Sequence, residues 1–194
     1  TATAGTLEYN GTAPFFTPLG TQRGVIPGMQ YYALNSGVAG SNATGSQSLF
    51  GVGVTLSAST VYTFESYWAI NKTAGTTSHT VSFGFGGVAT ISSIIYTGIG
   101  SGGTVINTVN VNSTNNICVN TTSLTVVTGA QTNATNAVQF RVSGVLSVSG
   151  AGTLIPQYSL SAAPGGAYTT QVGSYFLIYP IGAAGANVSV GTWT

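Results

Sequence analysis

The clearest alternation of apolar and polar positions lies between Ala137 and Gly182, where three consecutive segments have a period of two residues. In the first segment every even position from Val138 to Val148 is apolar or glycine, and most odd positions are polar. Because successive side chains of a strand point to opposite faces, this pattern predicts a strand with one buried face. The second segment, 153–160, contains Pro156, which cannot donate to a sheet ladder and therefore predicts an edge strand or a bulge.

The third segment, Tyr175 to Ile181, differs from the other two because it is apolar on both faces. A strand of this kind has to be covered twice, once by its own sandwich and once by something else. We therefore expect it to contribute to an interface between copies of the chain. The interface candidates are Tyr175, Phe176, Leu177, Ile178 and Tyr179.

The remaining pattern divides the chain into two parts. Residues 1–28 contain three of the six prolines and only short strand-like pieces around a tight-turn signal at Asn10-Gly11, so we expect a stalk or connector. Residues 29–194 are expected to form the head domain. Its other strands are predicted at 29–34, 50–56, 61–70, 79–85, 88–95 and 188–193.

Two segments of the head domain refine this prediction. In 61–70, the large apolar residues Tyr62, Phe64, Trp68 and Ile70 share one face. From 98 to 136 the chain is rich in Gly, Asn and Thr, and only weak strands are predicted, near 105–111 and 124–127. No capped 3.6-residue period is present anywhere. About eight to ten strands without helices predict an all-β fold, a jelly-roll β-sandwich with a short N-terminal stalk.

Composition narrows the function classes. A chain of 194 residues suits one sandwich, and its 43% apolar content gives it a core to bury. The only charged side chains, 3% of the chain, are Glu8, Arg23, Glu65, Lys72 and Arg141. No nucleic-acid partner is expected, because such binding needs clustered Lys and Arg. No window approaches about 18 uninterrupted apolar residues, so we expect no membrane-spanning helix.

Other features leave alternatives open. The single Cys118 cannot form a disulfide within the chain. The chain begins at Thr1 without a Met, which suggests a fragment, a processed product or the ordered end of a longer chain. We favour the last of these. Asn-x-Ser/Thr occurs repeatedly, as in glycosylated secreted proteins, but chance explains it better in a chain so rich in Asn and Thr.

The chain has few of the side chains that usually carry out catalysis. The chain has no Asp and only two Glu, in different segments, which argues against a paired-carboxylate hydrolase. A Ser-His-acid triad would have to use His79, but the chain has no G-x-S-x-G motif to supply the serine. We expect His79 at the surface or at a strand end. The minor alternative is that three copies of His79 bind a metal on a three-fold axis. The glycine-rich GIGSGG at 98–103 is followed by neither a helix nor a Lys, so it is interpreted as turns. We expect no enzyme activity, metal or cofactor.

Several stretches resemble known proteins. The opening ATAGTLEYNGT, the middle GVGVTLSASTVYTFESYWAINKTAGTTSHTVSFGFGG and the close GSYFLIYPIG resemble the carboxy-terminal domains of bacteriophage tail-fibre and other virion-fibre proteins. The order of a Tyr-x-Phe strand, a VSG-x-L segment and a last strand SYF-x-I is similar to the complement C1q and tumour-necrosis-factor type of jelly roll. That resemblance implies a homotrimer with the last strand near the three-fold axis. The stretch 104–136 has no counterpart in that pattern.

Three functions compete on this basis: a receptor-binding fibre tip on the virion surface, a structural virion protein such as a capsid decoration or head fibre, and an enzyme acting on host polysaccharide. The missing acids disfavour the enzyme. For the first, we expect a host glycan or protein as partner and other virion proteins at the stalk. The candidate contact residues are Asn110, Asn112, Asn115, Asn116, Thr121, Thr122, Tyr67, Tyr96 and Tyr168. The alternative is that the Asn and Thr residues only solvate a loop.

The small number of ionisable groups also bears on stability. His79 is the single side chain expected to titrate near neutrality. We therefore expect the stability of the protein to depend little on pH or salt.

Overall fold

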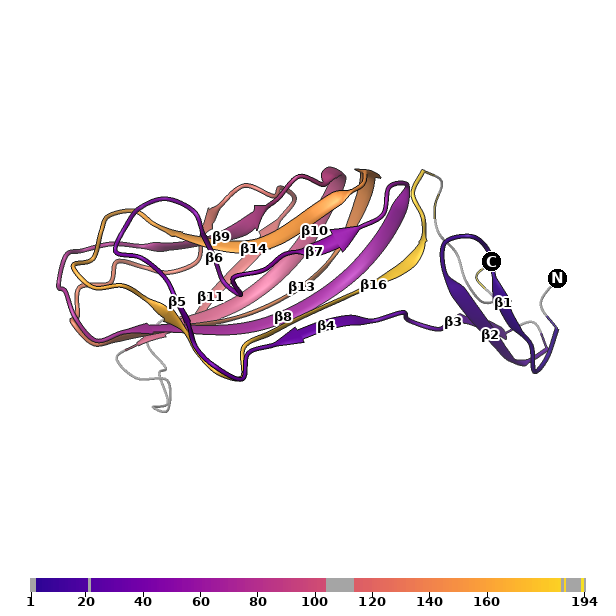
Figure 1. Ribbon diagram of the computed structural model, residues 1–194, viewed down its shortest axis with the longest axis horizontal. Helices are drawn as coiled ribbons and strands as arrows, with labels where there is room; N and C mark the ends of the chain where they lie inside the picture. The colour runs from indigo at the N-terminus through magenta and orange to yellow at the C-terminus, as the bar shows by residue number, and fades with distance from the viewer. Residues whose placement is uncertain (1–2, 21, 104–113, 186, 188–192, 194) are drawn as a thin grey trace.

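β-Strands make up all of the regular structure in the part of the chain that the computed structural model describes, residues 3–20, 22–103, 114–185, 187 and 193 (Figure 1). In this part, no helix is long and apolar enough to cross a membrane. The strands pair in antiparallel fashion, and two of the sheets pack face to face around one core. The protein is therefore an all-β sandwich, as the sequence predicted.

The larger sheet of the sandwich has the order β11-β10-β13-β8-β15-β5, and β16 joins β8 to β4. Its strands are β4 (Gln30–Ala33), β5 (Val38–Ala39), β8 (Thr60–Lys72), β10 (Thr90–Gly103), β11 (Thr114–Val119), β13 (Asn136–Gly150), β15 (Thr169–Thr170) and β16 (Tyr175–Ala183). The smaller sheet has the order β12-β9-β14-β6, with β7 also paired to β14. Its strands are β6 (Gln47–Ser48), β7 (Val54–Leu56), β9 (Val81–Gly86), β12 (Thr125–Val126) and β14 (Gly152–Leu160).

The core between the sheets is rich in aromatic rings. Along β8 and β13 the even-numbered side chains point inward, as their alternation predicted, while the odd-numbered ones lie on the outer face. Trp68 of β8 stacks on Phe83 of β9 with ring centroids 5.7 Å apart, and Phe64 meets Phe85 edge to face at 5.3 Å. Such pairs stabilise the core beyond simple burial of apolar area.

The glycine-rich segment 98–103 is part of strand β10, so our interpretation of it as turns is wrong. β10 pairs with β13 along its whole length, and Gly98 and Gly100 flank the ring of Phe140. A Cβ atom at either glycine would lie 2.3 Å from that ring, which leaves no room for a side chain. The glycines therefore serve close packing inside a strand.

Two further predictions need correction. The loop expected in 98–136 contains a real strand, β11, which pairs with β10, while the weak strand predicted near 124–127 is confirmed as β12. Strand β14 is not an edge strand, because it pairs with β9 on one side and with β6 and β7 on the other. Pro156 is tolerated because it lies between the stretch paired with β6 and the stretch paired with β7. The strands predicted at 105–111 and 188–193 lie outside the described residues, apart from Trp193.

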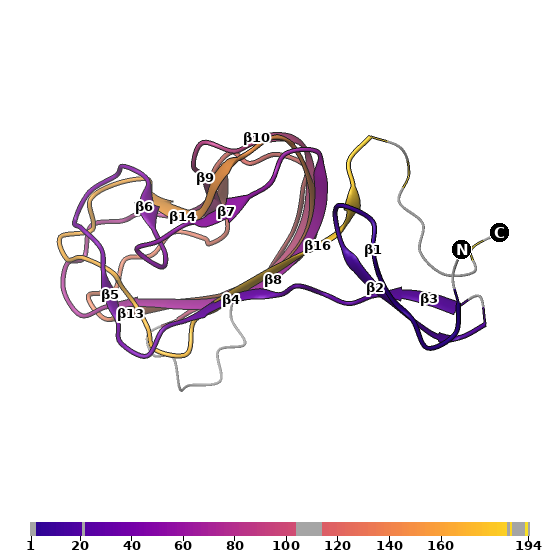
Figure 2. The same cartoon turned by 45° about the vertical axis from the view of Figure 1, so that its right-hand side comes forward.

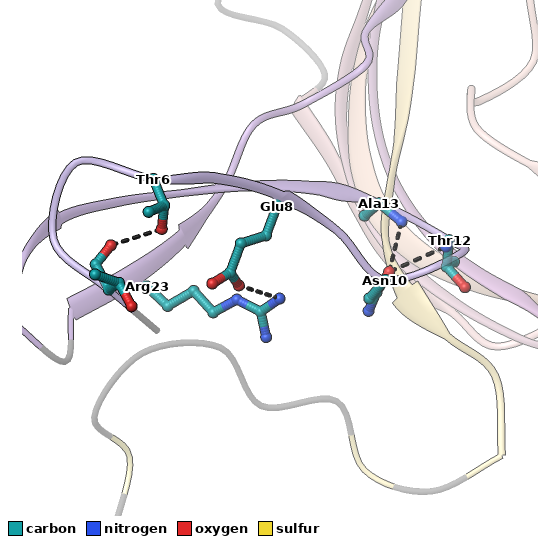
Figure 3. Close-up of polar contacts among 7 residues, drawn as sticks. Thr6, Glu8, Asn10, Thr12, Ala13 and Arg23 are labelled. Carbon is teal, nitrogen blue, oxygen red and sulfur yellow. Dashed lines mark hydrogen bonds and ion pairs between the residues drawn. The ribbon is translucent and has the colours of Figure 1, made fainter. Parts of the chain in front are cut away.

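The N-terminal part forms a separate three-stranded sheet at one end of the sandwich (Figures 1 and 2). It consists of β1 (Leu7–Tyr9), β2 (Pro14–Leu19) and β3 (Gln22–Val25), in that order. Asn10 shapes the β1–β2 turn, since its Oδ1 accepts hydrogen bonds from the backbone N–H groups of Thr12 and Ala13 at 3.0 and 2.9 Å (Figure 3). We call this sheet the stalk sheet.

Candidate functional site

The two acidic side chains lie in different sheets, and each is paired with an arginine. In the stalk sheet Glu8 is 2.8 Å from Arg23 (Figure 3). The Arg23 guanidinium also lies 4.0 Å from the ring centre of Phe15. In the large sheet Glu65 is 2.9 Å from Arg141. Among the described residues, no three His, Cys, Asp or Glu side chains come together in a group able to bind a metal.

Three tyrosines follow one another across the outer face of the large sheet. Tyr31 of β4 stacks on Tyr175 of β16 with centroids 5.8 Å apart, and Tyr175 lies 6.5 Å from Tyr67 of β8. We call these residues the tyrosine ridge. The hydroxyl of Tyr175 donates to Glu65 Oε1 at 2.6 Å. This hydrogen bond lowers the pKa of Glu65, as does the charge of Arg141. The same hydrogen bond raises the pKa of Tyr175, although the charge of Arg141 acts in the opposite direction there.

Some of the predicted interface and contact residues share this outer face. Tyr175 pairs with Tyr67, Tyr67 with Arg141, Arg141 with Ile99, and Ile99 with Asn116, so these five residues form one row across the sheet. Directly paired residues of neighbouring strands lie on the same face. The structure therefore brings Tyr67 and Asn116 to the face that also carries the half-buried Leu177 and Tyr179.

Other predicted residues do not lie where we expected them. Phe176 and Ile178 point into the core and are 5% and 0% exposed, so they are not available for an interface between copies. Tyr96 and Tyr168 are 1% and 0% exposed, so the prediction that they stack on a ligand is wrong. Burial raises the pKa of Tyr96 to about 12. Tyr96 lies on β10 and Tyr168 directly precedes β15, and both rings belong to the core between the sheets.

The Asn/Thr-rich candidates are divided between two places. Asn115 and Asn116 belong to strand β11, not to a loop, which corrects their expected setting. Thr121 is exposed and Thr122 half-buried, in a turn that covers β9: the backbone N–H of Phe85 donates to the Thr122 carbonyl at 2.9 Å. Asn110 and Asn112 lie outside the described residues.

The end of the sandwich opposite the stalk sheet is formed by four loops, 41–46, 73–78, 128–135 and 161–167, which we call the distal loops (Figure 1). Their residues are uncharged and carry many hydroxyl and amide groups. Asn42 Oδ1 accepts a hydrogen bond from the Gly165 N–H at 2.9 Å. Gly75 has a φ of +81°, and a Cβ there would lie 2.1 Å from the Pro164 carbonyl oxygen. The distal loops are thus packed on one another.

A buried lysine ties two of these loops together. Lys72 is 2% exposed, and its Nζ donates to carbonyl oxygens of both the 73–78 and the 128–135 loop. The acceptors are Gly75 and Asn133 at 2.6 Å and Ala74 and Ala134 at 3.2 Å. No acidic side chain takes part, and burial lowers the pKa of Lys72. Nothing in the alternation of β8 marked this residue, because its role depends on the loop that packs against it.

His79 lies in the interior, in a bridge to Gln131 two residues before β9 begins. We expected it at the surface or at a strand end, and the surface position is wrong. His79 is 2% exposed; its Nδ1 lies 2.8 Å from the Thr77 carbonyl and its Nε2 2.9 Å from the Tyr168 hydroxyl. The carbonyl can only accept, so Nδ1 bears the proton and neutral Nε2 accepts from Tyr168. The Tyr168 oxygen accepts in turn from Asn136 Nδ2 at 3.0 Å. Lys72, His79, Asn136 and Tyr168 form what we call the distal polar cluster.

The cluster favours a neutral imidazole. Burial is the main cause that lowers the pKa of His79, and the charge of Lys72 acts in the same direction. Asn136 Oδ1 is buried and has no hydrogen-bond partner among the described residues. The cluster therefore positions the loops around it by directional hydrogen bonds.

Comparisons with known proteins add no family: no family model, no curated protein and no solved structure matches the chain.

Proposed function

We propose that the chain is the host-binding head of a virion fibre, of the tail-fibre type that bacteriophages carry, and that it acts as a homotrimer without enzymatic activity. One observation supports this most: the molecule has two different ends. The stalk sheet lies at one end and the distal loops at the other (Figure 2). The stalk sheet carries exposed apolar side chains, whereas the distal loops are uncharged and rich in hydroxyl and amide groups.

We also propose that the sandwich is a jelly roll, and the strand order supports this. Strands β4-β16-β8-β13 are adjacent in the large sheet, and β7-β14-β9-β12 are adjacent in the small sheet. Two facing four-stranded antiparallel sheets built from strands that alternate between them are the arrangement of a jelly roll. On this view β10 and β11 are added strands that widen the large sheet at one edge.

The exposed apolar surface supports the trimer. Leu7 and Phe16 are directly paired and, with Tyr9, form one face of the stalk sheet; they are 73%, 41% and 71% exposed. A sheet of three short strands is marginal by itself. On the outer face of the large sheet, Ile95 and Ile99 are 57% and 60% exposed on the same face as Leu177 and the tyrosine ridge. A closed cyclic assembly covers such surfaces without leaving a free copy of them.

The distal loops support the host-binding part. Neutral sugars are bound by amide and hydroxyl groups that both donate and accept hydrogen bonds. Loops held on a rigid scaffold are the usual carriers of such groups. The distal polar cluster, through the Lys72 hydrogen bonds to two of the loops, supplies that rigidity here. Three copies increase the avidity of a weak single site.

Host-cell adsorption by the purified chain tests the proposal, together with its mass in solution from light scattering. A trimer that adsorbs is expected, and adsorption should fall in a variant in which exposed distal hydroxyls are removed: Ser41→Ala, Thr44→Ala, Thr76→Ala and Thr132→Ala. The matched control removes exposed hydroxyls near the stalk: Thr90→Ala, Ser92→Ala, Ser93→Ala and Ser149→Ala.

Three results would contradict parts of the proposal. A monodisperse monomer contradicts the trimer. Equal adsorption by both variants removes the distal loops as the contact surface. A trimer that adsorbs to no host cell favours a structural role in the virion, such as a head fibre, which labelled-antibody imaging of virions would then locate.

A further inference from the structure

The sandwich has an open edge between β4 and β7. Among the described residues β4 pairs only with β16, and β7 pairs only with β14. A cavity of about 350 Å³ opens between these two strands. We call it the edge pocket. Its lining residues come from β4, from the segment 50–55, from Pro156 of β14, and from Phe176 and Ile178 of β16.

The edge pocket has an apolar floor and a polar rim. The floor consists of core side chains: Phe50, Phe176 and Ile178 are 3%, 5% and 0% exposed. The rim carries Tyr31 and Tyr32, which are 57% and 45% exposed, and the exposed Gln30 and Thr55. Tyr32 is supported from below, because its ring meets Phe50 edge to face at 6.3 Å.

This arrangement limits what the pocket can bind. None of the five charged side chains of the protein lines it, and burying an unpaired charge on an apolar floor is costly, so the ligand is uncharged. A volume of about 350 Å³ is near the lower end of ligand pockets, which fits one small unit and not a chain of them. The ligand also needs an apolar group for the floor and hydroxyl or amide groups for the rim.

We propose that the edge pocket binds one N-acetylated hexosamine unit of an uncharged surface glycan, an inference that rests on the proposed host-binding function. The acetyl methyl group packs against Phe50 and Phe176, and the sugar ring lies against the exposed face of Tyr32. The amide of Gln30 and the hydroxyl of Thr55 exchange hydrogen bonds with the acetamide and the ring hydroxyls. A plain hexose offers a hydroxyl where the floor offers only carbon, and leaves that hydroxyl without a partner.

The full-length chain is titrated with N-acetylglucosamine and N-acetylgalactosamine, and with glucose and galactose as matched sugars lacking the acetamido group. Saturation-transfer NMR measures which ligand protons contact the protein. We expect saturable binding of at least one acetylated sugar, with the strongest transfer to its acetyl methyl, and at least tenfold weaker binding of both plain hexoses. No saturable binding of either acetylated sugar, or equal binding of the plain ones, overturns the proposal.

Two variants locate the site. Thr55→Trp fills the pocket from its exposed rim, and Tyr32→Ala removes the stacking face; each should weaken acetylated-sugar binding about tenfold or more. The control Thr90→Trp introduces the same ring at an exposed position outside the pocket and should bind as the wild type does. A thermal melt of each variant checks folding. Unchanged binding in the folded Thr55→Trp variant overturns the proposal.

The same variants separate this inference from the function on which it rests. If the wild-type chain adsorbs to host cells and Thr55→Trp adsorbs equally, the edge pocket is not the glycan site although host binding stands. If the acetylated sugar binds and Thr55→Trp abolishes binding, yet the wild-type chain adsorbs to no host cell, the pocket stands and the host-binding function fails.

Discussion

The interior of this protein contains two regions that are equally buried but are stabilised differently. Between the sheets, Trp68, Phe83 and Phe140 contact one another ring to ring, with centroids 5.4 to 5.7 Å apart. At the distal end, Lys72 and His79 are both 2% exposed, and their polar atoms are paired with carbonyl and hydroxyl groups. The first region depends on shape and apolar area, and the second on the direction and protonation of its hydrogen bonds.

The two regions contribute to the structure in different ways. An aromatic core tolerates changes of pH and salt, because dispersion and the hydrophobic effect involve no titrating group. A buried polar cluster is costly unless each member is paired, but when paired it specifies one arrangement of the groups around it. The core thus determines how stable the sandwich is, and the distal polar cluster determines how its loops lie.

Removing the central ring of the core should have the largest effect. Trp68 is fully buried, and Trp68→Ala leaves a cavity that the rigid sheets cannot close, so we expect unfolding free energy to fall by about 3–5 kcal/mol. Denaturant unfolding measures this, and Trp68→Phe, which keeps a ring, should lose clearly less. A loss below about 1 kcal/mol for the alanine variant would show that the core is not organised around this ring.

Removing the charge of Lys72 should have the next largest effect on the free energy of unfolding. Lys72→Met keeps the apolar stem but leaves the carbonyls of Gly75 and Asn133 without their donor, so we expect a loss of about 1–3 kcal/mol. Hydrogen exchange should rise in 73–78 and 128–135 before it rises in β8 or β13. Uniform acceleration over the whole sandwich would mean that Lys72 stabilises the fold as a whole and does not act on the loops.

Acid should weaken the distal end, contrary to our expectation that pH matters little. The pKa of His79 is lowered in the folded protein, so below the unfolded value of about 6.5 the unfolded chain binds more protons and stability falls as pH falls. The loss has an upper limit of about 1.4 kcal/mol per pH unit until the folded pKa is reached. Denaturant unfolding at several pH values between about 7.5 and 5.5 measures it.

The histidine itself provides the control for this prediction. His79→Gln keeps a hydrogen-bonding side chain but cannot titrate, so the variant is less stable at neutral pH and loses the pH dependence in this range. The same slope in both proteins would assign the pH dependence to another group.

The smallest effect is expected on the outer face. Tyr175→Phe removes the hydroxyl that donates to Glu65 but keeps the ring of the tyrosine ridge. Because this pair is partly exposed to solvent, we expect a loss of less than about 1 kcal/mol and a rise in the pKa of Glu65 toward its usual value. NMR titration of the Glu65 carboxyl measures that rise, and an unchanged pKa would show that Arg141 alone determines it.

Much of the sandwich was predictable because alternation is a local property. The even-numbered apolar positions of 61–70 and 138–148 face the core as expected, since a strand turns alternate side chains to opposite faces whatever it pairs with. For the same reason, the segment 175–181, which is apolar on both faces, was recognisable as a strand that needs cover on both sides. The pattern did not tell which of Phe176 and Leu177 faces the core and which the outer face.

The candidate site was less predictable, because composition does not say which residues meet. Tyr67, Tyr96 and Tyr168 are the same residue type, yet of these three only Tyr67 reaches a surface. The strand β11 has no alternation strong enough to reveal it, and it exists because β10 offers a paired edge.

By itself, the sequence determined the all-β class, the inward faces of the long strands and the scarcity of charge. Each of these follows from residue type and spacing along the chain. Only the tertiary structure decided that Lys72 and His79 are buried, that Gly98 and Gly100 make room for Phe140, and that β4 and β7 leave a pocket between them. These features depend on segments far apart in the chain that come into contact when the sheets pair, and no local pattern encodes such contacts.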